Sequence, residues 1–196
     1  MPDFLTLDDL DGDLNVTDKR VLVRSDLNLP MQDGKVTDAT RLVRAAETWT
    51  ELAKRGAKVI VLSHFGRPKG PDPKQSLGQL VEPVKAALPG LAVSFASDCI
   101  GAPASEAVAK LQPGGVLLLE NLRFHKGEEA NDPAFTKALA DLGDLYVNDA
   151  FSAAHRAHAS TAGLAALLPA AAGRLMQAEL EALGRALERE TAVVEG

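Results

Sequence analysis

Short runs of apolar residues alternate with segments of helical periodicity along most of the chain, and this alternation limits the possible folds strongly. Residues 20–25 read as a strand, and residues 58–63 read as a second strand that is apolar on both faces, which is typical of buried parallel strands. Between them, over residues 38–54, apolar side chains recur every three or four positions, as in an amphipathic helix. Strands and helices that alternate at this spacing predict an α/β fold, with a mainly parallel sheet and helices on both faces.

The same patterns predict three more strands and four more helices. The predicted strands are residues 91–96, 116–119 and 144–148, and the predicted helices are residues 76–88, 104–111, 133–142 and 174–190. Pro83 is expected to distort the second helix locally. Residues 191–196 read as the beginning of a further strand. We therefore expect residues 1–172 to form one domain, and residues 173–196 to be an interdomain helix and the truncated start of another domain.

Composition excludes some classes of partner. The chain has 196 residues, a formal net charge of −6 and a sequence pI of about 5.2, whereas nucleic-acid binding calls for a basic face. No apolar run approaches the roughly 20 residues that a membrane-spanning helix needs. The single cysteine, Cys99, cannot form an internal disulfide, which favours a reducing compartment. We expect a cytoplasmic, monomeric protein that binds neither nucleic acid nor membrane.

Polar and cationic side chains gather directly after the predicted strands. In parallel sheets, ligands bind outside the carboxyl ends of the strands, so these side chains predict a cationic cleft on an otherwise acidic domain. The residues in question are Asp26, Asn28, His64, Arg67, Lys69, Arg123, His155, Arg156 and His158. Taken singly, Asp26 and Asn28 also fit a simple turn, and residues 66–70 also fit a flexible surface loop.

Arg41 is a second indication of an anion site. It lies in the first turn of a predicted helix, where the macrodipole disfavours a cation by up to about 1 kcal/mol. An anion bound opposite Arg41 would explain this position, and a solvated arginine without function is the alternative.

No metal site is predicted. His155 and His158 have the spacing of two helical ligands, but the sequence shows no obvious third ligand near them. Cys99 is expected to be a small packing side chain rather than a nucleophile.

Five segments, taken together, resemble the signature segments of phosphoglycerate kinases in order and spacing. The segments are RSDLNLP, TDATR, SHFGRPKG, LLENLRF and NDAFSAAHRAHAS. The similarity extends over residues 19–190, and the third and fifth segments are the most specific. The resemblance implies a Rossmann-like domain that corresponds to the N-terminal, 3-phosphoglycerate-binding half of that family. Ser25, Leu27 and Leu29 depart from the usual wording of the first segment, at positions expected to pack.

The resemblance also implies roles for individual residues near the reacting groups. Asp26 and Asn28 would hold the hydroxyl and carboxylate region of the glycerate. Arg41 would lie beside the transferring phosphoryl group and stabilise its charge in the transition state, which makes it the catalytic residue of this set.

The remaining implied roles concern the substrate phosphate. His64 and Arg67 would bind the substrate, with Arg67 contacting the 3-phosphate. Arg123 and Arg156 would supply two further phosphate contacts. Arg24 would support the edge of the site.

The implied activity is that of a glycolytic transferase, which moves a phosphoryl group reversibly between 1,3-bisphosphoglycerate and ADP to give 3-phosphoglycerate and ATP. The sequence contains neither GxGxxG nor GxxxxGK[ST], so Mg-ATP and Mg-ADP are expected on a C-terminal nucleotide-binding domain of the same protein and not on this chain. We expect the chain alone to bind substrate and to be inactive as a kinase. A stand-alone anion-binding or regulatory module without catalysis is the alternative, and a nucleotide-binding doubly wound domain is a third possibility with only fold analogy behind it.

Overall fold

The computed structural model describes residues 4–194. Its centre is a sheet of six strands, all paired in parallel. In spatial order the strands are β5 (Val93–Ala96), β6 (Val116–Leu119), β4 (Lys58–Leu62), β1 (Arg20–Arg24), β7 (Leu145–Asn148) and β8 (Ala170–Ala172). The parallel sheet and all five of the predicted strands are confirmed.

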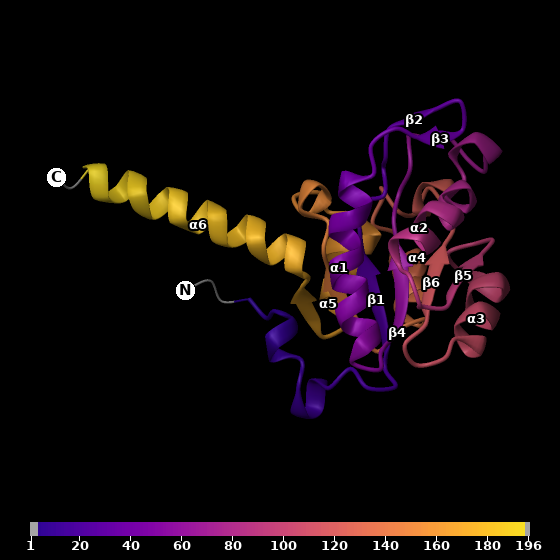
Figure 1. Cartoon of the computed structure of the whole chain (residues 1–196), viewed down its shortest axis with the longest axis horizontal. Coiled ribbons are helices and arrows are strands. Elements are labelled where there is room, and N and C mark those ends of the chain that lie inside the picture. Colours follow the sequence, from indigo (N-terminus) through magenta and orange to yellow (C-terminus); the bar gives the residue numbers. More distant parts are fainter. Residues whose placement is uncertain (1–3, 195–196) are drawn as a thin grey trace.

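Helices cover both faces of this sheet (Figure 1). The helices are α1 (Thr40–Lys54), α2 (Val81–Ala87), α3 (Gly101–Lys110), α4 (Pro133–Ala140), α5 (Leu164–Leu167) and α6 (Arg174–Val194). Short 3₁₀ helices span Leu7–Asp9, Gly12–Leu14, Pro73–Gln75, Leu77–Leu80, Leu122–Phe124 and Phe151–Ala153, and a π-helical turn spans Ala159–Gly163.

Alternation along the central strands divides the core into two layers. Val21 and Val23 of β1 pack with α1 and α2, whereas Leu22 packs with α3, α4 and α5. Successive side chains of a strand point to opposite faces, so a strand that is apolar throughout needs helices on both sides. Trp49 of α1 is completely buried in the first layer.

Three local features differ from the sequence-based expectations. β8 was not predicted, because its three alanines lack the β-branched side chains that mark a strand. A small antiparallel hairpin, β2 (Met31–Gln32) and β3 (Lys35–Val36), was also missed; its turn is Asp33-Gly34, with both residues at positive φ. The segment predicted as one helix over residues 76–88 is a 3₁₀ helix followed by α2, with Pro83 in the first turn of α2, where proline is tolerated.

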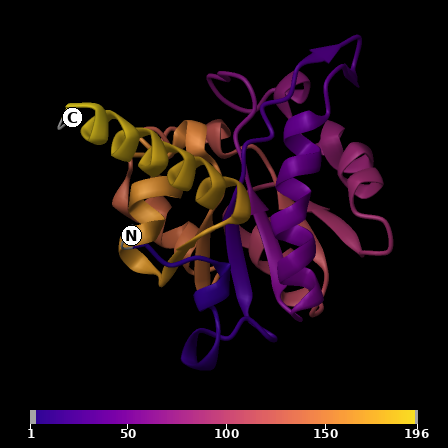
Figure 2. The same ribbon diagram turned by 60° about the vertical axis from the view of Figure 1, so that its left-hand side comes forward.

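The expectation of a strand after residue 190 is wrong for residues 191–194, which continue α6. The Thr191 hydroxyl donates to the Leu187 carbonyl (2.9 Å), a bond within one helical turn that a strand does not allow. Residues 195 and 196 lie outside the described residues. Figures 1 and 2 both show α6 leaving the body of the domain as an extended helix. None of the helices described for residues 4–194 has the length and apolar composition that a membrane crossing requires.

Candidate active site

The candidate site lies at the carboxyl edge of four adjacent strands. β6, β4, β1 and β7 are neighbours and run in the same direction, so the loops that follow them emerge at one edge of the sheet. The sequence-predicted site residues come from these loops, from the end of β1 and from the start of α1.

Asp26, Asn28 and Arg41 form one cluster. Arg41 Nη1 donates to the Asn28 carbonyl (3.2 Å) and lies 3.5 Å from Asp26 Oδ2. Asp26 Oδ1 accepts from the Asn28 backbone N–H (3.0 Å). Arg41 lies in the first turn of α1, as predicted, and 58% of its side chain is exposed. The cluster therefore presents a cation to solvent beside an amide and a carboxylate.

Gly66 connects Asn28 to Arg123. Its N–H donates to Asn28 Oδ1 (3.0 Å), and its carbonyl accepts from Arg123 Nη1 (3.1 Å). The backbone has φ +64° at this position, and a Cβ would clash with Gln75 Oε1, so glycine alone fits without rearrangement. Arg123 Nε also lies 3.4 Å from Glu129 Oε1. The loops after β1, β4 and β6 are thus joined at one point.

His64 lies beneath these loops, with Arg24 behind it. Arg24 Nη2 is 2.9 Å from His64 Nδ1, and both side chains are buried. Burial, followed by the nearby charges of Arg24 and Arg123, lowers the pKa of His64 to about 3. The imidazole is therefore neutral at pH 7 and is a poor proton acceptor.

Arg67 and Arg156 lie in the same group of loops, but both are exposed. Their side chains make no hydrogen bond or ion pair with residues 4–194. Of the other six predicted residues, Asp26, Asn28 and Arg41 contact one another, Arg123 is linked to Asn28 through Gly66, and Arg24 pairs with His64. The two exposed arginines are left free in solvent.

Two polar residues of this site were not singled out from the sequence. The Ser152 hydroxyl donates to Asp26 Oδ2 (2.8 Å) and so brings the loop after β7 to the first cluster. Ser152 lies within the NDAFSAAHRAHAS segment, but a serine in a loop carries no distinctive signal.

Asn121, the second missed residue, is completely buried and holds the loop after β4. Its Oδ1 accepts from the N–H groups of Phe65 (3.2 Å) and Arg123 (3.0 Å), and its Nδ2 donates to the carbonyls of Phe65 (2.7 Å) and Gln75 (2.9 Å). The available signal was a pair of polar residues, Glu120 and Asn121, directly after the fully apolar strand β6. Asn121 shapes the site without being exposed in it.

One group of possible metal ligands occurs within the part of the chain that the structure describes. It consists of Asp98, Cys99 and His125, whose ligand atoms lie within 4.8 Å of one another. His125 Nε2 pairs with Asp98 Oδ1 (2.7 Å), and the His125 ring stacks on Phe135. Burial, reinforced by the Asp98 carboxylate, raises the pKa of Cys99 well above its usual range. A protonated thiol and a paired imidazole account for this group as packing.

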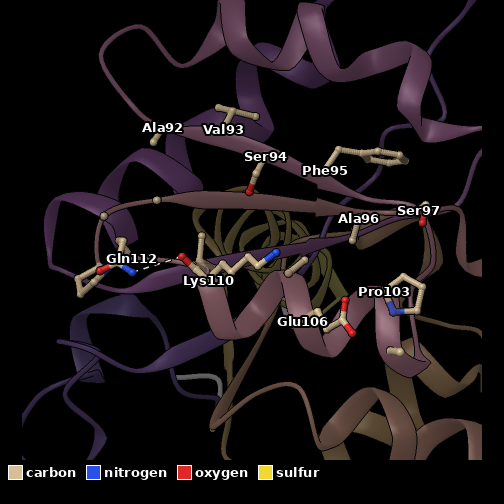
Figure 3. Close-up of a pocket in the computed structure, with 16 residues that line it drawn as sticks. Ala92, Val93, Ser94, Phe95, Ala96, Ser97, Pro103, Glu106, Lys110 and Gln112 are labelled. Carbon is tan, nitrogen blue, oxygen red and sulfur yellow. Dashed lines mark hydrogen bonds between the residues drawn. The ribbon is translucent and has the colours of Figure 1, made fainter.

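A cavity of about 880 Å³ lies elsewhere, along the edge strand β5 and beside α3 (Figure 3). Ser94 of β5 and Glu106 and Lys110 of α3 are among the side chains that line it. None of the eight predicted site residues lines this cavity, and its walls lack the converging arginines of the carboxyl edge. We therefore place the candidate site at the carboxyl edge, because its side chains are suited to binding an anion, and not in the cavity beside β5.

Comparison with known proteins shows the family to which the chain is similar. The family model described as phosphoglycerate kinase matches residues 11–195. Phosphoglycerate kinase of Rhodospirillum centenum is 66% identical over 187 residues, and that of Agrobacterium fabrum is 65% identical over 188 residues; each alignment covers 95% of this chain and 46% of the relative. The chain spans about half the length of the curated relatives it matches.

Solved structures give the same answer for the fold. Phosphoglycerate kinase from Coxiella burnetii superposes with a TM-score of 0.82 at 39% identity, and that from Pyrococcus horikoshii with a TM-score of 0.81 at 34% identity. Each superposition covers 93% of this chain and 45% of the other. The Rossmann-like α/β fold is confirmed, and the chain belongs to the phosphoglycerate kinase family.

Proposed function

We propose that this chain binds 3-phosphoglycerate at the carboxyl edge of its sheet and that the whole protein is a phosphoglycerate kinase. The observation that carries the proposal is that Asn28 and Arg123 both bond to the backbone of Gly66, while Arg41 bonds to the carbonyl of Asn28. Three loops are thereby held at one point, with cationic and amide groups among them. This arrangement suits a small anion that bears both a carboxylate and a phosphate.

The proposed roles follow from exposure and charge. Arg67 and Arg156 are exposed cations without partners among residues 4–194, so their guanidinium groups are free to contact a phosphate in bidentate fashion. Arg123 is anchored through Gly66 and would present its remaining donors beside them. Arg41, held at the first turn of α1, would stabilise the charge of the transferring phosphoryl group.

The chemistry requires little of the protein beyond positioning. The carboxylate of 3-phosphoglycerate is already ionised at pH 7, so no general base is needed, which agrees with a neutral, weakly basic His64. Phosphoryl transfer depends mainly on alignment and on stabilisation of charge. Arg41 and the phosphate-binding arginines would supply both on the substrate side.

We further propose that nucleotide and Mg²⁺ are bound by another domain of the whole protein, and that residues 173–196 lead toward it. Asp26 and Glu129 do not fit a magnesium site, because Asp26 is engaged by Ser152 and Arg41 and Glu129 is paired with Arg123. Leu183 and Leu187, four residues apart on α6, are more than half exposed, and a second domain would cover them.

The test is a calorimetric titration of 3-phosphoglycerate into the chain and into the Arg67→Ala variant. Since the exposed Arg67 side chain makes no hydrogen bond or ion pair within residues 4–194, we expect its removal to leave the fold intact. We expect saturable binding that is weakened roughly 10- to 100-fold in the variant, as the loss of one or two charge-assisted hydrogen bonds implies.

Arg185→Ala, which removes an exposed arginine of α6, is the matched control and should bind as the unmodified chain does. Sulfate should compete only weakly. If the chain is folded by circular dichroism and yet does not bind, or if Arg185→Ala weakens binding as much as Arg67→Ala, the proposed site is wrong.

A further inference from the structure

Arg24, at the end of the central strand β1, is a cation without access to solvent. Only 1% of the residue is exposed, and an unpaired charge in such a place is strongly unfavourable. Arg24 Nε donates to Ser160 Oγ (2.9 Å), Nη1 donates to the Ser25 carbonyl, and Nη2 contacts His64 Nδ1 (2.9 Å). The guanidinium is thus held from three directions and directed at the imidazole.

This contact determines the proton position on His64. A guanidinium has only donors, so His64 Nδ1 must accept, and an accepting ring nitrogen carries no proton. The proton of the neutral imidazole then lies on Nε2, which makes no hydrogen bond with the residues that the structure describes. The His64 ring is therefore neutral, and its Nε2–H is an unused hydrogen-bond donor on the side of the ring away from Arg24.

Ser160 links Arg24 to a second buried charge. Its hydroxyl accepts from Arg24, its backbone N–H donates to Glu128 Oε1 (2.8 Å), and its carbonyl accepts from the Tyr146 hydroxyl (2.8 Å). Ser160 lies in the π-helical turn Ala159–Gly163 and is completely buried. Such turns occur frequently at functional sites, and this one aims the serine hydroxyl at Arg24.

Glu128 supplies the compensating charge. It is completely buried, and its backbone carbonyl accepts from the Ala159 N–H (2.9 Å), which ties it to the same turn. Burial lowers the pKa of Arg24, and the Glu128 carboxylate is the strongest of the charges that oppose this effect. Oε2 of Glu128 has no hydrogen-bond partner among residues 4–194, so its charge is left to act on Arg24 through space.

We infer that Glu128 and Ser160 are positioning residues, which hold Arg24 so that it fixes His64 as the Nε2–H tautomer facing the substrate. The part of this inference that concerns substrate rests on the proposed function. An Nε2–H donor can bond to an oxygen of an anionic ligand without itself changing charge over the pH range in which the ligand is ionised. Through Arg24, Glu128 and Ser160 therefore keep the Nε2–H of His64 as a hydrogen-bond donor whose protonation does not vary with pH near neutrality.

The charged groups around His64 support the same behaviour. Arg24 from β1, Arg123 from the loop after β6 and His158 from the loop after β7 all disfavour a proton on His64, and Asp26 alone favours it. Glu128 lies behind Arg24. Burial and these three groups together outweigh the effect of Asp26, and they keep the His64 ring neutral above about pH 3.

The test is a long-range ¹H–¹⁵N spectrum of the histidine rings in the ligand-free chain at pH 5.5 and 7.5, with His64 assigned by its absence in His64→Gln. We expect the Nε2–H pattern for His64 and no titration between these pH values. In Ser160→Ala, which keeps the backbone bonds of residue 160 but removes the acceptor of Arg24 Nε, we expect a mixture of tautomers.

Arg24→Met should raise the pKa of His64 by roughly one unit or more, since a neighbouring cation is removed. Arg24→Met leaves the Glu128 charge without its partner and is at risk of unfolding, so a double variant, Arg24→Met/Glu128→Gln, removes both charges. Its loss in the free energy of unfolding should be smaller than the sum of the losses of the two single variants. Glu106→Gln, an exposed glutamate of α3, is the control and should change neither reading.

An Nδ1–H pattern, or titration of His64 near its ordinary pKa in the unmodified chain, would overturn the inference. An unchanged His64 spectrum in Ser160→Ala would also overturn it. If the losses of stability in Arg24→Met/Glu128→Gln are strictly additive, Glu128 has no part in positioning Arg24. These readings need no ligand. If they agree with expectation but 3-phosphoglycerate does not bind, the proposed function fails while the assignment of the tautomer stands.

Discussion

The side-chain oxygen of Asn28 accepts a hydrogen bond of 3.0 Å from the backbone N–H of Gly66, across 38 positions of the sequence. The bond joins the loop after β1 to the loop after β4, two strands that lie side by side in the sheet. Gly66 adopts φ +64° to offer this N–H, and its carbonyl receives Arg123 from the loop after β6. The backbone of a single glycine therefore sets the distance between an amide and an arginine of the proposed substrate site.

Gly66→Ala should weaken both the fold and ligand binding. A residue with a Cβ in the left-handed region costs about 1–2 kcal/mol, and this Cβ would also displace Gln75. We expect a loss of that order in the free energy of unfolding, measured in urea, and weaker binding of 3-phosphoglycerate measured by calorimetry.

Gly70→Ala is the matched control. Gly70 lies in the same loop, has no positive φ, and would place its Cβ in open space. It should lose little in either measurement. Equal losses in the two variants would show that the loop as a whole, rather than the backbone at Gly66, determines the effect.

Much of the sheet was predictable because its strands contain short continuous apolar runs, which are typical of parallel strands covered on both faces. Strands β1 and β4 are buried on both faces over most of their length, so each has a run of three or four hydrophobic side chains that stands out from its surroundings. The carboxyl-edge location of Asp26, His64 and Arg123 then follows from the parallel direction of the strands. Those features depend on residue type and order alone.

Other parts depended on tertiary contacts that no local pattern reveals. β8 consists of three alanines and is a strand because it pairs with β7. Residues 191–194 continue α6, because extension of an existing helix costs less than the start of a new element. The contact of Arg24 with Ser160 spans 136 positions, so the buried charges behind His64 appear only once the chain is folded. The Asp33-Gly34 hairpin, by contrast, carries a local turn signal and could have been predicted.

Asn121→Ala should destabilise the chain through several groups at once. The substitution removes two acceptor and two donor contacts and leaves the carbonyls of Phe65 and Gln75 without this partner in a buried place. A loss of about 2–4 kcal/mol in the free energy of unfolding is expected. Asn15→Ala, an exposed asparagine with one local bond to the Thr17 N–H, is the control and should lose less than about 1 kcal/mol. Similar losses at the two positions would contradict the bridging role of Asn121.

Asp149 should stabilise the fold more at low pH than at high pH, whereas a carboxylate whose pKa is lowered by folding does the reverse. Burial raises the pKa of Asp149 to about 6, although Asp149 Oδ1 accepts from the N–H groups of Leu175 (3.0 Å) and Met176 (3.2 Å) at the start of α6. Since the folded-state pKa lies above the unfolded value of 3.8, the contribution of this group to stability is complete below pH 3.8 and is lost as the pH rises through about 6.

Asp149→Asn removes this titration. Relative to the unmodified chain, the variant should gain stability between pH 4 and pH 7, by at most about 3 kcal/mol. Urea unfolding at several pH values measures the difference and cancels the opposite contribution of His64, whose lowered pKa costs stability as the pH falls from 6.5 toward 3. Asp33→Asn, in an exposed turn at φ 51° where asparagine is tolerated, should show no such trend. A flat difference for Asp149→Asn would mean that the N–H groups of α6 keep the carboxylate ionised.

Arg174 holds the start of α6 against two other segments, and lysine should not replace it. Its guanidinium forms paired contacts with Glu51 of α1 (2.8 and 2.6 Å) and with Asp8 (3.1 and 2.8 Å). Lysine offers a compact charge that cannot form both forks at once. We expect Arg174→Lys to lower the free energy of unfolding by about 1 kcal/mol through Glu51, and we expect the loss to shrink in 1 M salt. A double-mutant cycle with Glu51→Gln isolates that pair. Arg185→Lys on the exposed part of α6 is the control, and a coupling energy of zero between Arg174 and Glu51 would show that packing around Met176, rather than the ion pairs, holds the helix in place.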